Sequence, residues 1–172
     1  MVERVRFPAQ VEAAVRTDEL VAVMAGPFHL NRWNSAPTHE SMRALGDALA
    51  KWAPGVPGGK TAGMAIIDAA GARRMDEDTR SEAGRLQGFM DDYNVAVAQV
   101  VSGSRFMASA ARAVINGIHL LSRRSHASEV FSNAEMAIPW VVDHFMAESK
   151  LLVDRQQALD TWSRMVAVAR GE

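Results

Sequence analysis

The sequence predicts an α/β protein with a mostly parallel sheet of about four to five strands, helices packed on it, and an extra C-terminal helix. Two observations support this. Short runs rich in Val, Ile and Ala alternate with longer amphipathic segments along most of the chain. The run at residues 61–68 is apolar at 64–67 without polar alternation, which is typical of a strand covered on both faces. The other elements are expected to be neighbours of this central strand.

The first half of the chain carries one strand and one helix before the central strand. Gly26 and Pro27 end the first clear strand, and Pro37 suits the first turn of a helix because its missing N–H costs little there. In chain order we expect an edge strand or a helical turn at residues 11–15, a strand at 19–25, a loop at 28–34, a helix from 35–38 to Trp52, a Gly/Pro loop at 54–59 and the central strand from Thr61.

The second half continues the alternation and ends in two helices. Asp76 or Asp78 is expected to cap the next helix, because acidic side chains suit a helix N-terminus. In chain order we expect a helix from residue 78 to about 94, a strand at 95–101, a helix opened by Gly103 and Ser104, a strand at 129–131, a helix capped by Ser132 or Asn133 through about His144, and a last helix at 149–169.

The last predicted helix has a wide apolar stripe. Leu152, Leu159 and Val166 recur every seven residues, and five further apolar positions widen the stripe: Leu151, Ala158, Trp162, Met165 and Ala169. A stripe of this width can cover the sheet or meet a second copy of the chain. We therefore expect a homodimer through this helix.

Composition limits the classes of protein and of site. A length of 172 residues predicts a single domain over 1–172. The net charge of −1 gives no global attraction to nucleic acid or to an anionic membrane. No cysteine is present, which excludes disulfides and thiolate sites and fits a reducing compartment. The start of the chain lacks the apolar core of a signal peptide, and no apolar run approaches a membrane span, so we expect a cytoplasmic protein.

Two segments carry a family resemblance. Residues 66–76 form an apolar strand, an aspartate, a short loop and Met-Asp before a helix, and residues 128–140 run through Val, Phe, a turn, Ala and Trp. In this order and spacing they resemble the STAS domain in its SpoIIAA-like branch, over roughly residues 19–145. The resemblance implies a non-enzymatic signalling or scaffold module, similar to anti-sigma-factor antagonists, that binds an anti-sigma kinase or another regulatory protein partner.

The resemblance also implies a phosphorylated Ser directly after Met-Asp, and here the sequence departs from it. Glu77 and Asp78 follow Met75 and Asp76. Their fixed charge can imitate part of a phosphate, or it can simply favour the helix N-terminus.

A related group, SpoIIAA-like and CRAL-TRIO-like, is linked to lipids and other apolar ligands, which implies a second function. The chain has ten Met residues, and Met suits adaptable pockets as well as ordinary cores. The alternative function is therefore binding of a lipid or another small apolar ligand in a Met-rich cavity. Six methionines are candidates to line it: Met64, Met90, Met107, Met136, Met146 and Met165.

Topology predicts where a functional surface would lie. In a parallel sheet the loops that follow the strands gather at one edge, and ligands favour that edge. The predicted partner-binding or switch region is Arg73, Arg74, Asp76, Glu77, Asp78, Ser104 and Arg105, while Arg123, Arg124 and His126 are expected at the opposite edge.

Other motifs lack the context that their chemistry needs. Residues 54–61 end like a phosphate-binding loop, but the first Gly is replaced and the segment enters a strand rather than a helix. His144 and Glu148 lie four residues apart without a third ligand at matching spacing, so we expect no metal site. Gly103 and Ser104 fit an anion site or, more commonly, a helix cap. We predict no catalytic residue and no cofactor.

Overall fold

The computed structural model describes residues 3–68, 75–103, 109 and 126–172. Within these residues the chain forms six strands and four α-helices, which alternate through the middle of the chain. The elements are β1 Ala13–Arg16, β2 Leu20–Ala25, β3 Phe28–Trp33, α1 His39–Trp52, the short 3-10 turns Ala53–Gly55 and Pro57–Gly59, β4 Thr61–Asp68, α2 Glu77–Asp91, β5 Asn94–Ser102, β6 Ala127–Phe131, α4 Ala134–Ser149 and α5 Arg155–Arg170.

All six strands belong to one sheet in the order β1-β2-β3-β4-β5-β6. Strand β2 runs antiparallel to both β1 and β3. Strands β3, β4, β5 and β6 run parallel to one another. The α/β class is therefore confirmed. The expected count of about four to five strands was too low, and the sheet is mixed rather than mostly parallel because the N-terminal hairpins add antiparallel strands at one edge.

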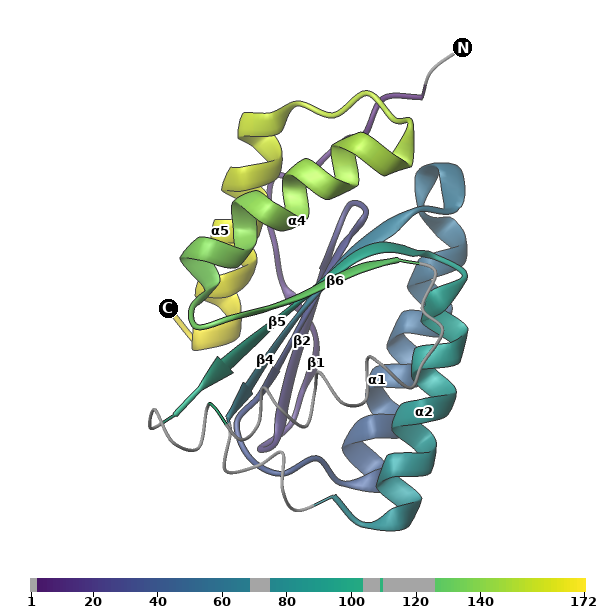
Figure 1. The fold of residues 1–172 in the computed structure, drawn as a ribbon, viewed down its shortest axis with the longest axis vertical. Helices are drawn as coiled ribbons and strands as arrows, with labels where there is room; N and C mark the ends of the chain where they lie inside the picture. Colours follow the sequence, from purple (N-terminus) through teal and green to yellow (C-terminus); the bar gives the residue numbers. More distant parts are fainter. Residues whose placement is uncertain (1–2, 69–74, 104–108, 110–125) are drawn as a thin grey trace.

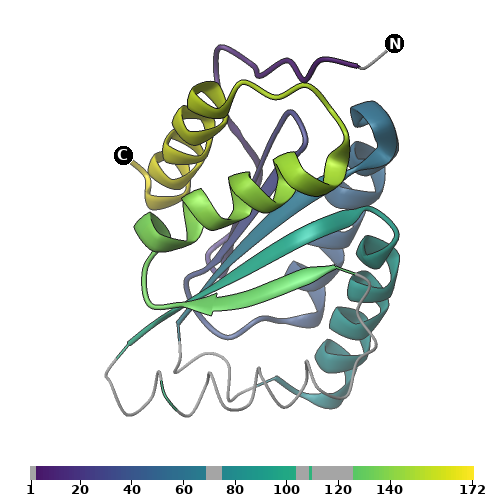
Figure 2. The ribbon, with the colours of Figure 1, turned by 45° about the horizontal axis from the view of Figure 1, so that its top comes forward.

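Helices cover both faces of the sheet. Helices α1 and α2 pack against one another on one face, and α4 and α5 lie on the other face (Figure 1). On that second face α4 crosses β4, β5 and β6, while α5 lies over β2 and β3 (Figure 2). The central strand β4 is thus covered on both sides, as its apolar run predicted.

Strand β3 corrects the prediction of a loop at residues 28–34. Gly26 adopts a φ of +58° at the first position of a two-residue turn, so Gly26 and Pro27 join β2 and β3 in a hairpin instead of ending the strand region. Phe28 and Leu30 face α4 and α5. The polar residues that alternate with them, His29 and Asn31, face α1 and α2. For residues 11–15 the sequence allowed an edge strand or a helical turn, and the structure has the edge strand β1 there.

Helix starts agree with the capping signals in the sequence. Asp76 caps α2 by accepting a hydrogen bond from the Thr79 backbone N–H at 2.7 Å. Asn133, rather than Ser132, caps α4 by accepting from the Met136 N–H at 2.9 Å. Thr38 caps α1 through Ser41, so Pro37 precedes the cap instead of lying in the first turn. The predicted helix after Gly103 lies outside the described residues.

The C-terminal helix is shorter than predicted and belongs to the core. Helix α5 begins at Arg155, and the segment before it pairs with the N-terminal stretch, where Val5 N–H donates to Leu152 O at 2.9 Å. Leu152, expected in the apolar stripe, is 55% exposed. The rest of the stripe packs on the chain's own sheet: Ala158, Trp162, Met165, Val166 and Ala169 are buried there. The expectation of a homodimer therefore loses the surface that motivated it, and it remains a prediction.

The two faces of the sheet have cores of different character. The core under α4 and α5 is large and apolar, with Phe28 stacked on Trp162 and edge-on to Phe145. The core under α1 and α2 is smaller and includes Leu20, Ala22, Trp33 and Leu45. Among the described residues, no helix combines the length and the apolar character that crossing a bilayer requires.

Candidate functional site

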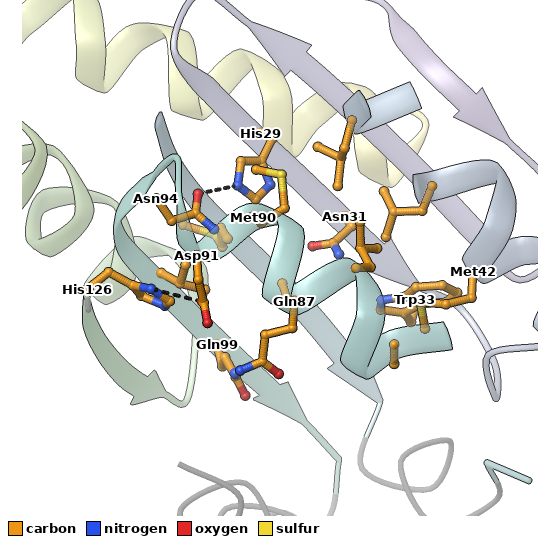
Figure 3. A pocket seen from close by; sticks show the side chains of 17 residues that line it. His29, Asn31, Trp33, Met42, Gln87, Met90, Asp91, Asn94, Gln99 and His126 are labelled. Atoms are coloured by element: carbon orange, nitrogen blue, oxygen red, sulfur yellow. Dashed lines mark hydrogen bonds and ion pairs between the residues drawn. The ribbon is translucent and has the colours of Figure 1, made fainter. Parts of the chain in front are cut away.

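A cavity of about 180 Å³ lies between the sheet and helices α1 and α2, within the smaller core. Strands β3, β4 and β5 form its floor, and the two helices form its roof (Figure 3). The described lining residues are His29, Asn31, Trp33, Met42, Leu45, Leu49, Met64, Ala65, Ala83, Leu86, Gln87, Met90, Asp91, Asn94, Val97, Gln99 and His126. The lining is unusual for a core because seven of these residues are polar.

Strand register explains how polar side chains reach this cavity. His29 pairs with Gly63 on β4, and Asn31 pairs with Ala65, which in turn pairs with Gln99 on β5. Paired residues on neighbouring strands face the same side of a sheet, so these side chains all face α1 and α2. Gly63 and Ala65 fill little space in the middle of these rows. The central strand therefore leaves the room that the polar side chains border.

His29 anchors a buried hydrogen-bond network. Its Nε2 lies 2.9 Å from Asn94 Oδ1, and the Thr61 hydroxyl donates to the same oxygen at 2.8 Å. All three residues are buried. With the Asn94 amide in this orientation, Oδ1 accepts from both groups, so His29 carries its proton on Nε2 and presents Nδ1 as an acceptor. The Asn94 amide group remains a donor at the cavity wall.

The pKa of His29 is lowered to about 4, mainly because the side chain is buried. The hydrogen bond to Asn94 raises the pKa in part, and His126 lowers it further. His29 is therefore neutral at pH 7. A neutral imidazole can donate with one nitrogen and accept with the other, whereas an imidazolium can only donate. Trp52 from the end of α1 closes this side, with its ring edge-on to His29 at 5.6 Å between centroids.

Gly63 is required for this position of His29. A Cβ built on Gly63 would lie 2.5 Å from His29 Nε2 and closer still to Cε1, a separation that real Cβ atoms do not show. The imidazole thus crosses directly over β4 to reach Asn94 on β5. Any larger residue at position 63 would displace it.

Asp91 and His126 form the wall next to β6. Asp91 ends α2, and His126 directly precedes β6; Asp91 Oδ1 and His126 Nδ1 lie 3.3 Å apart. The His126 side chain is 2% exposed and the Asp91 side chain 28% exposed. Figure 3 shows this pair with Asn94 and Gln99 at one end of the cavity, and Trp33 with Met42 at the opposite end. The cavity therefore has a polar end and an apolar end.

A second, larger hollow adjoins the polar end. It has a volume of about 550 Å³ and shares Asp91 and Asn94 with the first cavity. Its remaining lining residues are Lys60, Asp92, Val95, Ala127, His144 and Glu148. His144 and Glu148, considered above as a ligand pair, thus border a surface hollow. In the described part of the chain no three His, Cys, Asp or Glu side chains are placed to hold a metal ion.

The predicted partner-binding region is placed only in part. Asp76 caps α2, and Glu77 and Asp78 lie exposed in the first turn of that helix. None of these three lines either hollow. The remaining members lie outside the described residues: Arg73, Arg74, Ser104 and Arg105. The position of the three acidic residues agrees with the simpler interpretation, in which they favour the start of the helix.

The predicted Met-rich cavity is also placed only in part. Met90 lines the cavity under α1 and α2, together with Met42, which was not among the predicted methionines. Met64 borders the cavity, but its side chain packs in the opposite core, beside its strand partner Leu30. Met146 and Met165 pack in the opposite core, and Met136 is 60% exposed. Met107 lies outside the described residues. The methionines therefore do not share one cavity.

Sequence reasoning missed the polar lining residues. His29, Asn31 and Gln99 were assigned to a loop or passed over within a strand. One signal was available: residues 28–31 alternate between apolar and polar side chains, which is the period of a strand. That alternation would normally place the polar side chains in solvent, and only the helices above β3 turn them into cavity residues.

Comparisons with known proteins give no family for this chain. A scan against protein-family models finds no match, and a search of curated proteins finds no relative.

Proposed function

We propose that this protein is a non-enzymatic binding protein that holds a small molecule in the cavity between the sheet and helices α1 and α2. One observation carries the proposal: buried His29 and half-buried Asn31 and Gln99 face an unfilled space between the sheet and helices α1 and α2. Polar side chains around an unfilled space offer hydrogen-bond donors and acceptors to a ligand, which an apolar lining would not. A core built only for stability would be filled with apolar side chains at these positions.

The described lining residues lack a reactive nucleophile, which supports binding rather than catalysis. No described lining residue offers a hydroxyl, thiol or amine nucleophile. Asp91 and His126 are adjacent, but no nucleophile stands within the described lining for that pair to activate. The amide and imidazole groups can recognise a ligand through hydrogen bonds.

The proposal modifies the ligand-binding alternative from the sequence. The volume of about 180 Å³ is smaller than the roughly 300–1,000 Å³ typical of pockets for drug-sized ligands, so it favours a compact molecule over a lipid with long chains. A STAS-type role with a regulatory protein partner at Asp76, Glu77 and Asp78 stays a prediction. A small ligand under α2 would lie beneath the helix that these residues begin, so the two roles are compatible.

Filling the cavity tests the proposal. Ala65 lies on the floor between Asn31 and Gln99, and Ala65→Leu would occupy the space. Ala50→Leu is the matched control, because Ala50 is exposed on α1. We expect native mass spectrometry of the protein as purified to show a small bound mass on the wild type and on Ala50→Leu, and none on Ala65→Leu.

Two results would contradict the proposal. One is a bound mass that Ala65→Leu retains while it stays folded by circular dichroism, because that ligand would sit elsewhere. The other is bare protein for all three forms together with no rise in melting temperature for the wild type in a screen of small ring compounds, because a ligand that binds the folded state raises its stability.

A further inference from the structure

The cavity has room for about one ring. Its volume is about 180 Å³, and an apolar protein cavity of about 150 Å³ is known to hold benzene. Ala65 forms a low floor because its side chain projects little above β4, whereas the neighbouring Gly63 is covered by the His29 imidazole. Leu86 and Met90 of α2 also line the cavity and provide apolar surface for the second face of a ring.

The two ends of the cavity require different chemistry. The end near α1 is apolar and is lined by Trp33, Met42 and Leu45. The indole N–H is the one polar group of these three side chains. At the other end Asn94 offers an amide N–H, and the amide of Gln99 can donate or accept. An occupant that spans both ends therefore carries an apolar body and a hydrogen-bonding group at one end.

The charges around the polar end disfavour a charged ligand. The described lining residues include no Lys or Arg, and the imidazole of His29 is neutral at pH 7, so these residues offer an anion little in exchange for its hydration. Asp91 adds a negative charge that repels an anion. The Asp91 carboxylate and the His126 imidazole lie 3.3 Å apart, so a charged ligand of either sign would have to displace an existing contact at this end.

From size, polarity and charge together, we infer that the ligand is an uncharged single-ring molecule with one hydrogen-bonding substituent. Its ring would lie over Ala65, beside the His29 imidazole, and its substituent would point toward Asn94 and Gln99. This inference rests on the proposed binding function and adds the class of ligand.

Three benzyl probes of nearly equal size separate the classes. Benzyl alcohol is neutral, benzoate is anionic and benzylammonium is cationic at pH 7. We would measure their dissociation constants for the full chain by titration with NMR detection. We expect benzyl alcohol to bind at least about tenfold more tightly than either charged probe, because a charge that leaves water without a partner is costly.

A charge-removing variant tests the reason for this preference. Asp91→Asn keeps the shape of the side chain and removes its charge, so it should strengthen benzoate binding by about threefold or more and change benzyl alcohol little. Asp92→Asn is the matched control, because Asp92 is exposed and borders only the second hollow. We expect it to leave the constants for all three probes unchanged.

The outcomes distinguish the ligand class from the binding function. Tightest binding of benzoate or benzylammonium would overturn the neutral class and leave the cavity as a binding site. Binding of none of the probes would also overturn the single-ring class, while native mass spectrometry and Ala65→Leu decide the binding function independently. Equal effects of Asp91→Asn and Asp92→Asn on benzoate would reject the electrostatic reason.

Discussion

His29 and Gly63 depend on each other, since the imidazole of one lies over the backbone of the other. The contact is close enough that any Cβ at position 63 would overlap the imidazole ring. The ring in turn reaches Asn94, which also accepts from Thr61. A single glycine on the central strand thus positions a buried network that spans three strands.

Gly63→Ala should therefore lower the free energy of unfolding by about 1–3 kcal/mol through overpacking. Gly84→Ala is the matched control, because Gly84 is exposed on α2 and a Cβ there meets no heavy atom within 4 Å. That change should raise stability by about 0.5–1 kcal/mol because Ala favours the helix. Urea denaturation measures both. In a His29→Ala background the cost of Gly63→Ala should largely vanish, and an unchanged cost would reject the stated contact.

The lowered pKa of His29 predicts a pH dependence of stability. The folded value is about 4, whereas an exposed His has a pKa of about 6.5. Between these values the unfolded chain binds more protons than the folded chain, so stability rises with pH. The contribution is complete above pH 6.5 and decreases as pH falls toward 4, by about 3 kcal/mol over the window.

Urea denaturation at pH 7.5 and 4.5 checks this dependence. His29→Gln should lose less stability between the two pH values than the wild type, because it removes the group that takes up a proton on unfolding. His39→Gln, at an exposed position at the start of α1, should retain the wild-type difference. A His29→Gln protein with the same loss as the wild type would show that other groups cause the effect.

At the scale of elements, helix starts follow local chemistry. Four N-cap side chains accept from a backbone N–H three residues later: Thr38, Asp76, Asn133 and Asp154. Each satisfies an N–H group that has no partner within the helix. Two of the starts were predictable from short motifs, because the partner is always within one turn.

The cap of α4 gives a sharp test, because the sequence allowed Ser132 or Asn133. Asn133 Oδ1 accepts from Met136 N–H at 2.9 Å, so Asn133→Ala should destabilise the protein by about 1 kcal/mol. Ser132 contacts only the Met136 sulfur, at 3.9 Å, so Ser132→Ala should stay within about 0.5 kcal/mol of the wild type. Chemical denaturation of both variants measures the difference, and equal costs would argue against the assigned cap.

At the scale of the whole molecule, α5 completes the larger core. Trp162 is fully buried and stacks on Phe28 with 5.0 Å between ring centroids. Two arginines on the sheet hold the end of the helix: Arg16 donates to Val168 O at 3.1 Å, and Arg32 donates to Ala169 O at 3.2 Å. Cations at the last carbonyl groups of a helix favour its C-terminal end.

Trp162→Ala should therefore cost about 3–5 kcal/mol, because it removes a large side chain from a packed core. Leu152→Ala is a suitable control from the same predicted stripe, since Leu152 is 55% exposed and should change stability by less than about 0.5 kcal/mol. Thermal and urea unfolding would compare them. A small cost for Trp162→Ala would mean that α5 does not belong to the cooperative core.

The sequence alone determined the local features of this protein. Residues 61–68, 19–25 and 95–101 appear as strands within one or two residues of β4, β2 and β5, because short apolar runs bounded by Gly and Pro are local signals. The start of α2, with Asp76 as a possible cap, could likewise be predicted from the sequence. The predicted starts of α1 and α5 were less accurate, because a cap depends on one particular backbone geometry rather than on composition.

Only the tertiary structure decided which side chains surround the cavity. His29 and Asn31 carry no local sign of burial, and a polar residue in a strand normally faces solvent. Their place under α1 and α2 depends on the β2–β3 hairpin, on the register of β3 with Gly63 and Ala65, and on helices from later in the chain. Burial on a sheet face is set by pairing between distant segments, which the local pattern of residues does not encode.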